Sequence, residues 1–326
     1  MPAKSTRGIM TRSVATSVAR CACIDIGSNT TRLLVAEDGD GRPRELLSQR
    51  AFTRLGSARR AHGELGAPMV AEVATLVAHM ARVARELDAE GLRIVATSAV
   101  RDAVDAADLS GAVASACGVT LEILSAEDEA RLAFAGAIGM LADPPAGRLG
   151  VVDVGGGSTE LVAGSVAAGV TWSVSLPLGS CDVTARDLPS DPPSAAELAR
   201  LRTTLADAFA GLDVPQPVAA YAVGGGAGSL QRLVGAEFSR EALSRALQAL
   251  VVRPSTEVAL ALGLHAERAR LLPAALLLLD AAAHAMNATL QLAGGGLREG
   301  IVLEQLELAR AGDRGSQVRD VANPGY

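Results

Sequence analysis

Residues 24–35 of this 326-residue chain have the sequence Ile24-Asp25-Ile26-Gly27-Ser28-Asn29-Thr30-Thr31-Arg32-Leu33-Leu34-Val35. The pattern returns without a gap at residues 152–163, as Val152-Asp153-Val154-Gly155-Gly156-Gly157-Ser158-Thr159-Glu160-Leu161-Val162-Ala163. Each copy is typical of an apolar strand that ends in Asp, a turn of small residues, and a second apolar strand. Backbone N–H groups in such a turn can converge on an anion, while the Asp binds a metal ion or a water. The repeat predicts two related halves that face one phosphate-bearing ligand across a cleft.

The composition narrows the classes of function. The length allows two domains that each bury a core. Aromatic residues make up 2% of the chain, so aromatic stacking is a poor candidate for ligand binding. The net charge of −6 argues against general nucleic-acid binding. Lys4, near the N-terminus, is the only lysine, which argues against a P-loop lysine and a Schiff-base lysine.

The cysteines and the apolar segments favour a cytoplasmic protein with no membrane partner. The four cysteines form no C-x-x-C pair or disulfide pattern, which favours a reducing compartment. The longest uncharged segment, residues 161–181, contains Gly and Pro and alternates like a β-hairpin rather than a membrane span. Residues 1–20 lack the apolar core of a signal peptide, and we expect a disordered extension there. The four histidines are too scattered to predict a zinc site.

The order of the apolar segments predicts an α/β protein of two domains. In the first half, strands are expected at 22–26, 31–37, 92–97 and 119–124, and helices at 68–87, 103–117 and 127–141. After a linker, Asp143-Pro144-Pro145-Ala146-Gly147, strands are expected at 149–154, 159–163, 170–176, 218–223 and 289–293. We therefore predict domain I at residues 21–142, domain II at 143–297, a helix at 298–312 that completes domain I, and a flexible tail at 313–326.

Five segments in a fixed order resemble the exopolyphosphatase and guanosine-pentaphosphate phosphohydrolase (Ppx/GppA) phosphatase family. They are the two turns above, Ala96-Thr97-Ser98-Ala99-Val100-Arg101-Asp102-Ala103, Ser125-Ala126-Glu127-Asp128-Glu129-Ala130-Arg131 and Gly296-Leu297-Arg298-Glu299-Gly300. Residues 267–274 are a looser match, and the resemblance runs from residue 22 to about residue 308. It implies two ribonuclease-H-like, actin-like ATPase domains with a central cleft, the fold of actin, hexokinase and heat-shock ATPases. The chain is similar to the short, two-domain type of the family.

The resemblance implies two catalytic residues, Glu129 and Arg101. Glu129 matches the general base that activates the attacking water, a role that suits a carboxylate whose pKa is tuned by its surroundings. Asp128 stands where the family has Glu, which puts the weight on Glu129. Arg101 matches an arginine that contacts phosphate, and a guanidinium can bind two phosphate oxygens. From the pattern alone, Glu129 could also be an ordinary acid favoured by a helix dipole, and Arg101 a surface arginine.

The acids of the two turns predict a metal site. Asp25, Asp153 and Glu160 would repel a polyanion unless a divalent cation lay between them, and Mg²⁺ prefers a few carboxylates together with waters and phosphate oxygens. Either Asp alone could instead stabilise its turn by side-chain hydrogen bonds, and Glu160 could lie on a solvated hairpin face. We therefore expect Mg²⁺ or another divalent cation at these three residues.

The small residues of the two turns are the candidate phosphate-binding residues, because glycine lets the backbone approach an anion and hydroxyls add donors. They are Gly27, Ser28, Asn29, Thr30, Gly155, Gly156, Gly157, Ser158 and Thr159. A third turn, Gly224-Gly225-Gly226-Ala227-Gly228-Ser229, is either a phosphate loop or a site of close packing. A cluster of six arginines either guides a polyanion or forms a solvated face: Arg42, Arg44, Arg50, Arg54, Arg59 and Arg60.

The resemblance implies an Mg²⁺-dependent hydrolase that releases the terminal phosphate of inorganic polyphosphate by water attack. Guanosine pentaphosphate, cleaved to the tetraphosphate, is the alternative substrate. A kinase of the same fold would need an acceptor site and a nucleotide pocket, and a non-catalytic sensor would bind a phosphorylated alarmone without turnover. The resemblance is also compatible with a homodimer. The pattern leaves the preferred chain length open.

Overall fold

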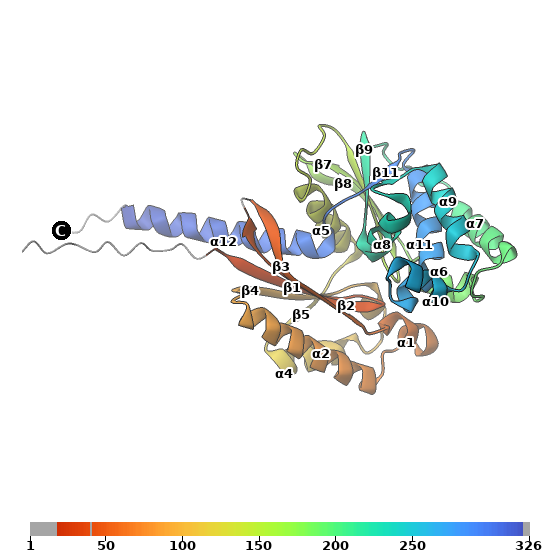
Figure 1. Cartoon of the computed structure of the whole chain (residues 1–326). Coiled ribbons are helices and arrows are strands. Elements are labelled where there is room, and N and C mark those ends of the chain that lie inside the picture. The colour runs from red at the N-terminus through yellow and green to blue at the C-terminus, as the bar shows by residue number, and fades with distance from the viewer. Residues whose placement is uncertain (1–17, 40, 322–326) are drawn as a thin grey trace, which may run out of the picture.

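The computed structural model describes residues 18–39 and 41–321 and contains two α/β domains (Figure 1). The first sheet has the strand order β3-β2-β1-β4-β5, and its strands are β1 (Arg20–Ile26), β2 (Thr30–Gly39), β3 (Arg42–Phe52), β4 (Gly91–Ala96) and β5 (Leu121–Ile123). β1, β2 and β3 are antiparallel neighbours, whereas β4 is parallel to β1 and β5 is parallel to β4. The antiparallel hairpin therefore carries the first turn, and the parallel strands end beside it.

The second sheet repeats this arrangement. Its order is β10-β11-β9-β6-β7-β8, and its strands are β6 (Leu149–Val154), β7 (Thr159–Ser165), β8 (Gly169–Leu176), β9 (Ala219–Val223), β10 (Glu237–Phe238) and β11 (Leu290–Leu292). β6, β7 and β8 are antiparallel neighbours, and β9 and β11 follow on the parallel side. The duplication predicted from the two turns thus extends to both sheets, and the uncharged segment 161–181 is the predicted hairpin.

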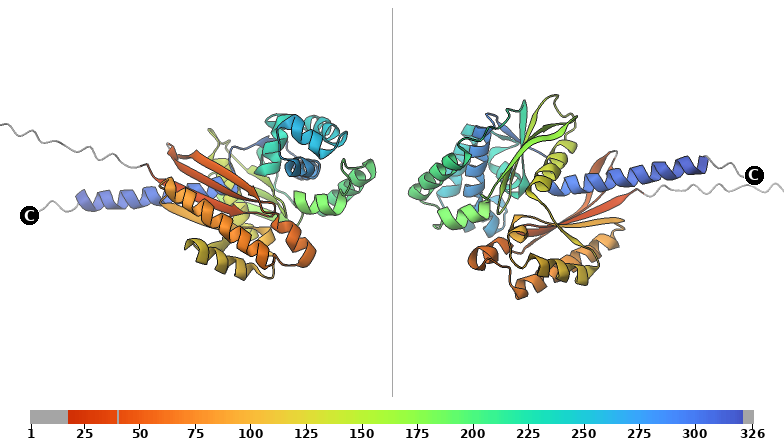
Figure 2. Two further views of the ribbon diagram at one scale, coloured as in Figure 1. Left: turned by 60° about the horizontal axis from the view of Figure 1, so that its bottom comes forward. Right: turned by 180° about the vertical axis from the view of Figure 1, so that it is seen from behind.

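Helices cover both faces of each sheet (Figure 2). On the outer face of the first sheet, α2 (Ala67–Glu86) and α4 (Ala106–Cys117) bury Val73, Val77 and Leu109 against strand residues such as Ile24 and Ile94. Two short helices, α1 (Leu55–His62) and α3 (Ser98–Arg101), follow β3 and β4. They lie at the end of the sheet where the first turn is located.

The inner faces are covered by two helices that each belong to the other half of the chain. α5 (Ala126–Gly139) follows the first sheet but packs Phe134 and Ala137 against Val151 and Val162 of the second sheet. α12 (Leu297–Val321) follows the second sheet but packs Ile301 against the first. The C-terminal helix, expected to complete domain I, thus contacts the first sheet. α5, whose residues the expected boundary places in domain I, packs Phe134 on the second sheet and Leu132 in the cluster of the first sheet and α12.

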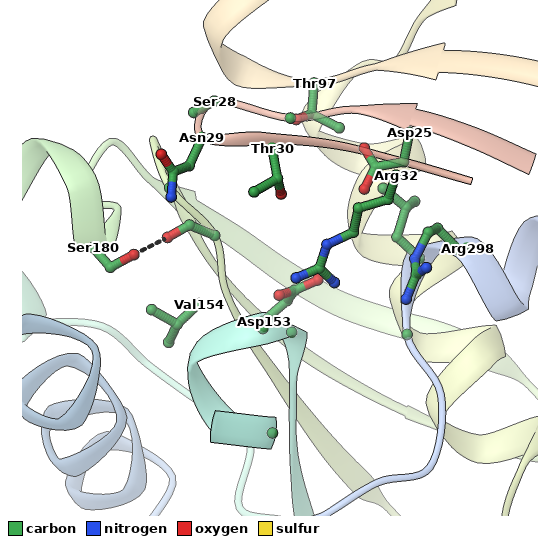
Figure 3. Close-up of a pocket in the computed structure, with 18 of the residues that line it drawn as sticks. Asp25, Ser28, Asn29, Thr30, Arg32, Thr97, Asp153, Val154, Ser180 and Arg298 are labelled. Carbon is green, nitrogen blue, oxygen red and sulfur yellow. Dashed lines mark hydrogen bonds between the residues drawn. The ribbon is translucent and has the colours of Figure 1, made fainter. Parts of the chain in front are cut away.

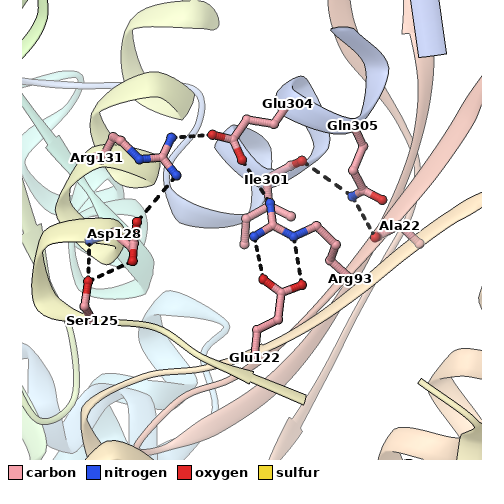
Figure 4. Close-up of polar contacts among 9 residues, drawn as sticks. All are labelled: Ala22, Arg93, Glu122, Ser125, Asp128, Arg131, Ile301, Glu304 and Gln305. Atoms are coloured by element: carbon pink, nitrogen blue, oxygen red, sulfur yellow. Dashed lines mark hydrogen bonds and ion pairs between the residues drawn. The ribbon is translucent and has the colours of Figure 1, made fainter. Parts of the chain in front are cut away.

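Polar contacts fix the ends of these two helices (Figure 4). Arg93 of β4 donates from Nε and Nη2 to Glu122 at 3.1 and 2.7 Å, and from Nη1 to Glu304 of α12 at 2.9 Å. Glu304 also pairs with Arg131 of α5. One carboxylate therefore ties both exchanged helices to the first sheet.

The other face of the second sheet carries six helices, α6 (Ser180–Asp187), α7 (Ala195–Phe209), α8 (Gly224–Val234), α9 (Arg240–Val251), α10 (Ser255–Leu262) and α11 (Ala266–Ala285). α7 begins with a capping box in which Ser194 and Glu197 each accept a hydrogen bond from the other's backbone N–H. α2 and α11 are long and apolar enough to resemble membrane spans. Most of α11 is buried in the domain II core, which accounts for its apolar sequence.

Several parts of the chain differ from the sequence-based expectation, among them the short helices α1 and α3, which were not predicted. β3 was not predicted, because arginines and other polar residues interrupt its apolar alternation. α6 was not predicted either, since it is short and follows a Pro-Leu-Gly turn. The tail expected from residue 313 is helical to Val321, and residues 322–326 lie outside the described part. Residues 1–17 of the expected N-terminal extension also lie outside the described part of the chain, and β1 begins at Arg20.

Because α5 and α12 cross at closely packed glycines, adding one methyl group at the crossing is expected to have a large effect on stability. A Cβ built on Gly136 would overlap the carbonyl oxygen of Gly296 and lie 2.6 Å from the backbone nitrogen of Gly300. Gly136→Ala is therefore expected to lower the free energy of unfolding by about 1–3 kcal/mol, measured by urea denaturation. Gly111→Ala in α4 is the control, because its Cβ would meet nothing within 4 Å. Equal denaturation midpoints for the two variants would contradict this packing.

Candidate active site

The two copies of the repeat form hairpins with the same hydrogen bond across the turn. Gly27 N–H donates to the carbonyl oxygen of Thr30 at 3.0 Å, and Gly155 N–H donates to that of Ser158 at 2.9 Å. The first turn joins β1 to β2, and the second joins β6 to β7. Residues that align in the sequence thus occupy equivalent places in the two sheets.

The tips of the two turns lie against each other. A Cβ built on Gly156 would lie 3.0 Å from Cβ of Ser28, and one built on Gly157 would lie 2.8 Å from Oγ of Ser28. Ser28 Oγ is 3.2 Å from Ser98 Oγ at the start of α3. Glycine in the second turn therefore allows a contact between domains that a side chain would block.

A cavity with a volume of about 240 Å³ is lined by both turns (Figure 3). Most of the sequence-predicted site residues belong to its wall: Asp25, Gly27, Ser28, Asn29, Thr30, Glu129, Asp153, Gly155, Gly156 and Ser158. The amide nitrogen Nδ2 of Asn29 is buried and has no hydrogen-bond partner within the described residues. The wall therefore offers an unused donor beside two glycine-rich turns, as an anion site requires.

Four predicted residues do not line the cavity. Gly157 packs against Ser28 and Ser98 instead. The hydroxyl of Thr159 donates to the carbonyl oxygen of Leu178 at 2.6 Å, so it is used inside domain II. Glu160 and Arg101 do not belong to its lining either. The direct ligand contacts expected for these four residues stay predictions.

Asp25 and Asp153 enter the cavity from opposite domains (Figure 3). Burial raises the pKa of Asp25, and burial followed by repulsion from Glu160 and Asp25 raises the pKa of Asp153 to about 7. Across residues 18–39 and 41–321, neither carboxylate has a hydrogen-bond or ion-pair partner. Two partly buried, unpartnered carboxylates that face one cavity form a favourable place for a cation.

The donor set fits Mg²⁺, which commonly takes one or two carboxylates and completes its shell with water and phosphate oxygens. In the part of the chain that the structure describes, no three His, Cys, Asp or Glu side chains gather as a metal-binding group. The expected third ligand, Glu160, is 1% exposed, and its Oε1 accepts a hydrogen bond from Ser175 Oγ at 2.8 Å. The structure thus brings together two of the three predicted ligands.

Glu129 lines the cavity from the first turn of α5. Arg101 Nη1 donates to Glu129 Oε2 at 3.1 Å and to the carbonyl oxygen of Leu124 at 2.8 Å. Burial and repulsion from Glu160 raise the pKa of Glu129 well above its usual value, against the opposing effect of Arg101. A buried carboxylate with a raised pKa, held by an arginine, is suited to accept a proton from water.

The side chain of Asp128 forms contacts at the start of α5 instead of lining the cavity. Ser125 Oγ donates to Asp128 Oδ2 at 2.8 Å, and Arg131 lies 3.7 Å from the other oxygen of the same carboxylate. Asp128 is exposed and bonds to Ser125, the N-cap residue of α5, whereas Glu129 is buried at the cavity. The structure therefore supports the choice of Glu129 over its neighbour.

Three arginines in the wall were not predicted as site residues: Arg32, Arg268 and Arg298. Burial, and then repulsion from neighbouring arginines, lowers the pKa of Arg32 to about 9. Arg268 is 6% exposed, and its Nε has no partner among the described residues. Arg32 belongs to the sequence repeat and Arg298 to one of the segments that match the family, so the sequence held a signal that could have identified both as site residues. Together they make one side of the cavity cationic.

The third glycine turn also reaches the cavity. Gly224, Gly225 and Gly228 line it, and α8 begins there without a side-chain cap. The free N–H groups of a first helical turn favour an anion. A Cβ on Gly225 would also lie 2.9 Å from Nη2 of Arg268, so close packing and ligand access coincide at this turn.

Most of the six clustered arginines are used in ion pairs or hydrogen bonds. Arg44 pairs with Glu37, and Arg42 donates to the carbonyl oxygen of Ala142. Three further pairs bridge the two domains: Arg54 with Glu267, and both Arg59 and Arg60 with Asp182. Because most of these arginines are already engaged, the arrangement does not favour guidance of a polyanion by the whole cluster. Of the six, Arg50 alone keeps that capacity.

Residues 34–309 match the model of the Ppx/GppA phosphatase family. This match covers well over half of the chain, and the chain belongs to this family of phosphatases. It is 33% identical over 307 residues to exopolyphosphatase 1 of Mycobacterium leprae, covering 88% of this chain and 90% of that protein. It is 32% identical over 306 residues to exopolyphosphatase 1 of Mycobacterium tuberculosis, with 88% of each chain covered.

Solved structures agree on the fold. The crystal structure of the Ppx/GppA family member of Aquifex aeolicus has a TM-score of 0.77 and 25% identity, and covers 90% of this chain and 99% of that one. An exopolyphosphatase from Cytophaga hutchinsonii has a TM-score of 0.78 at 19% identity, and covers 88% and 98%. The predicted family and the predicted two-domain fold around a cleft are confirmed.

Proposed function

We propose that this protein is an exopolyphosphatase, which releases terminal orthophosphate from inorganic polyphosphate. The observation that carries the proposal is one cavity lined by two partly buried aspartates, by Glu129, which is paired with Arg101, and by a cationic side. The aspartates would hold a divalent cation, and the arginines would offset the charge of a polyanion. The exopolyphosphatases of Mycobacterium, which are similar over most of the chain, support the same activity.

The reaction can be assigned to the residues of the cavity. The N–H groups of the two turns bind the oxygens of the terminal phosphoryl group, and Asp25 and Asp153 are the residues that would hold Mg²⁺, which would supply charge neutralisation there. Glu129 accepts a proton from a water as the water oxygen bonds to the terminal phosphorus. The anhydride bond breaks in line, and its oxygen stays on the shortened chain. No covalent intermediate with the protein is required.

Arg101 is then a positioning residue. It holds one oxygen of Glu129, which leaves the other oxygen free to accept the water proton. It also lowers the pKa of a carboxyl that burial and Glu160 raise. The contact of Arg101 with phosphate, implied by the family resemblance, stays a prediction.

The pH dependence of kcat follows from the pairing of Glu129 with Arg101. Glu129 must be ionised to act as a base, so kcat is expected to fall on the acid side at a pH above the usual titration range of glutamate. Glu129 faces Arg101, Glu160 and Asp153, and only Arg101 lowers its pKa. Arg101→Gln is therefore expected to raise that pKa further and to move the acid limb of the kcat profile to higher pH. An acid limb at the same pH in both proteins would contradict the role of Arg101.

The wall of the cavity favours an inorganic chain over a nucleotide. Within the described residues that form it, none is aromatic, so no ring is available to stack on a guanine base. All four cysteines are free thiols, which accords with the proposed cytoplasmic location. Guanosine pentaphosphate remains the alternative that the test must measure.

Phosphate release by the purified full-length protein tests the proposal. Polyphosphate and guanosine pentaphosphate are compared at equal concentrations of chain ends, with Mg²⁺ and with EDTA. We expect Mg²⁺-dependent release from polyphosphate with the higher kcat/KM. A higher kcat/KM for the nucleotide would replace the proposed substrate, and transfer of phosphate to an acceptor other than water would replace hydrolysis by kinase chemistry.

A further inference from the structure

The start of a short helix binds the carbonyl groups of the first turn. Gly56 N–H, in α1, donates to the carbonyl oxygen of Ser28 at 2.8 Å. The N–H groups of Thr53 and Arg54, which precede α1, both donate to the carbonyl oxygen of Asn29 at 3.1 Å. A Cβ built on Gly56 would lie 3.2 Å from the carbonyl oxygen of Ser28, so glycine lets α1 approach the turn this closely. α1 therefore packs directly on the first turn.

α6 binds the second turn in the same way. The N–H and the hydroxyl of Ser180 both donate to the carbonyl oxygen of Gly155, at 2.9 and 3.0 Å (Figure 3). Cys181 N–H donates to the carbonyl oxygen of Gly156 at 2.9 Å. A Cβ built on Gly179, the N-cap residue of α6, would overlap the carbonyl group of Gly156. The structural repeat therefore includes the helices that hold the turns.

These hydrogen bonds leave N–H groups of the turns available to a ligand. The C=O and N–H groups of one trans peptide point in opposite directions, so a carbonyl group held by a helix turns the next N–H away from that helix. The next N–H groups include those of Asn29 and Gly156, and within residues 18–39 and 41–321 neither donates to another group. Both residues line the cavity. α1 and α6 thus set the direction of donors that a phosphate would use.

Asp182 joins the two helices across the domains. Its carboxylate, on α6, accepts a hydrogen bond from Arg59 Nη2 of α1 at 3.0 Å and also pairs with Arg60 of α1. The side chains are 15%, 24% and 25% exposed, so solvent screens these pairs less than ordinary surface pairs. Asp182 N–H also donates to the carbonyl oxygen of Gly156 at 3.3 Å. One residue therefore contacts the second turn and the helix that holds the first.

We propose that Asp182 is a positioning residue for phosphate release, because it keeps the two turns at the separation and orientation that the reaction requires. The inference rests on the proposed function and deepens it. The turns bind the terminal phosphoryl group from opposite domains, so a small displacement of one turn would move the phosphorus out of line with the water at Glu129. Binding of the rest of the chain depends on the charge of the whole cavity and is less sensitive to this spacing.

The test compares kcat and KM for polyphosphate in the parent, in Asp182→Ala and in Asp187→Ala. Asp187 is the matched control, because its carboxylate pairs with Arg186 of the same helix and not with domain I. Asp182→Ala is expected to lower kcat about 10–100-fold and to change KM less than about twofold, as for a misplaced reacting group. Asp187→Ala is expected to change neither. Unchanged kcat in Asp182→Ala, or an equal loss in both variants, would overturn the inference.

The two arginine partners provide a second test. Arg59→Gln combined with Arg60→Gln removes both partners of Asp182, and is expected to lower kcat about as much as Asp182→Ala does. If the three side chains act through one contact, adding Asp182→Ala to this variant should lower kcat less than about twofold further. Losses that multiply would show that these residues act independently, which contradicts the proposed link.

Hydrogen exchange separates this inference from the proposed function. Asp182 belongs to domain II but is expected to order the first turn, in domain I. Exchange of the backbone amides of residues 27–30, measured by mass spectrometry without substrate, is expected to be about tenfold faster in Asp182→Ala than in the parent and unchanged in Asp187→Ala. Unchanged exchange in Asp182→Ala would overturn the inference alone. A parent protein that hydrolyses no polyphosphate would overturn the proposed function.

Discussion

Glu129→Gln is expected to lower kcat for phosphate release from polyphosphate by about 10²–10⁴-fold, the usual contribution of a general base. The substitution keeps the size of the side chain but removes the group that accepts the proton of water. Binding of polyphosphate is expected to persist, because the two turns and the arginines of the cavity are unchanged. Initial rates and equilibrium binding, measured on the same preparation, check both halves of this prediction.

A matched control separates catalysis from helix stability. Glu129 lies in the first turn of α5, and an acid there also interacts favourably with the helix dipole. Glu241 lies in the first turn of α9, is exposed, and is remote from the cavity. Glu241→Gln should remove a similar dipole interaction and leave kcat unchanged. If Glu129→Gln retained full activity, the assignment of the base would be wrong.

Asp153→Asn and Asp25→Asn are each expected to lower Mg²⁺-dependent activity at least about 100-fold, because each removes one of the two carboxylates that face the cavity. The effect should also be visible without substrate. A cation that binds only the folded protein stabilises it by about 2.7 kcal/mol at 100 times its Kd. Thermal unfolding of the parent should therefore shift upwards with Mg²⁺, and that shift should be lost in both variants.

The cation-free variants provide the check on folding. Asp25 and Asp153 are partly buried and carry charge at a cost, as their raised pKa values indicate, so their replacement by the neutral amide is expected to leave the cation-free protein at least as stable. Asp207→Asn, at an exposed position of α7, is the control and should keep the full Mg²⁺ shift. A Mg²⁺ shift of the parent size in Asp25→Asn and Asp153→Asn would place the cation elsewhere.

The repeat was the strongest source of information in the sequence, and its success has a physical reason. Each turn connects two buried strands, so its residues are fixed by the hydrogen bond at Gly27 or Gly155 as well as by the ligand. The same pattern therefore predicted the hairpins, the doubled sheets and the shared cavity. Glu129 was found through the family resemblance, because an acid in a first helical turn has no distinguishing local signal.

The features that sequence reasoning left open or missed depend on tertiary contacts. Whether Glu160 reaches the cation depends on Ser175, a residue of the neighbouring strand that holds its carboxylate. Arg268 becomes part of the cavity only because α11 packs beside the start of α8. The packing of α5 on the second sheet leaves no local trace either, since an apolar helix face does not specify which sheet buries it.

Hydrolysis in H₂¹⁸O tests whether a water in this cavity attacks the terminal phosphorus. Polyphosphate is incubated with the protein and Mg²⁺, and the released orthophosphate and the shortened chain are analysed by mass spectrometry. Our account predicts one heavy oxygen in each released orthophosphate and none in the shortened chain, with the signal lost in Glu129→Gln. Heavy oxygen in the shortened chain, or release that survives in Glu129→Gln, would contradict it.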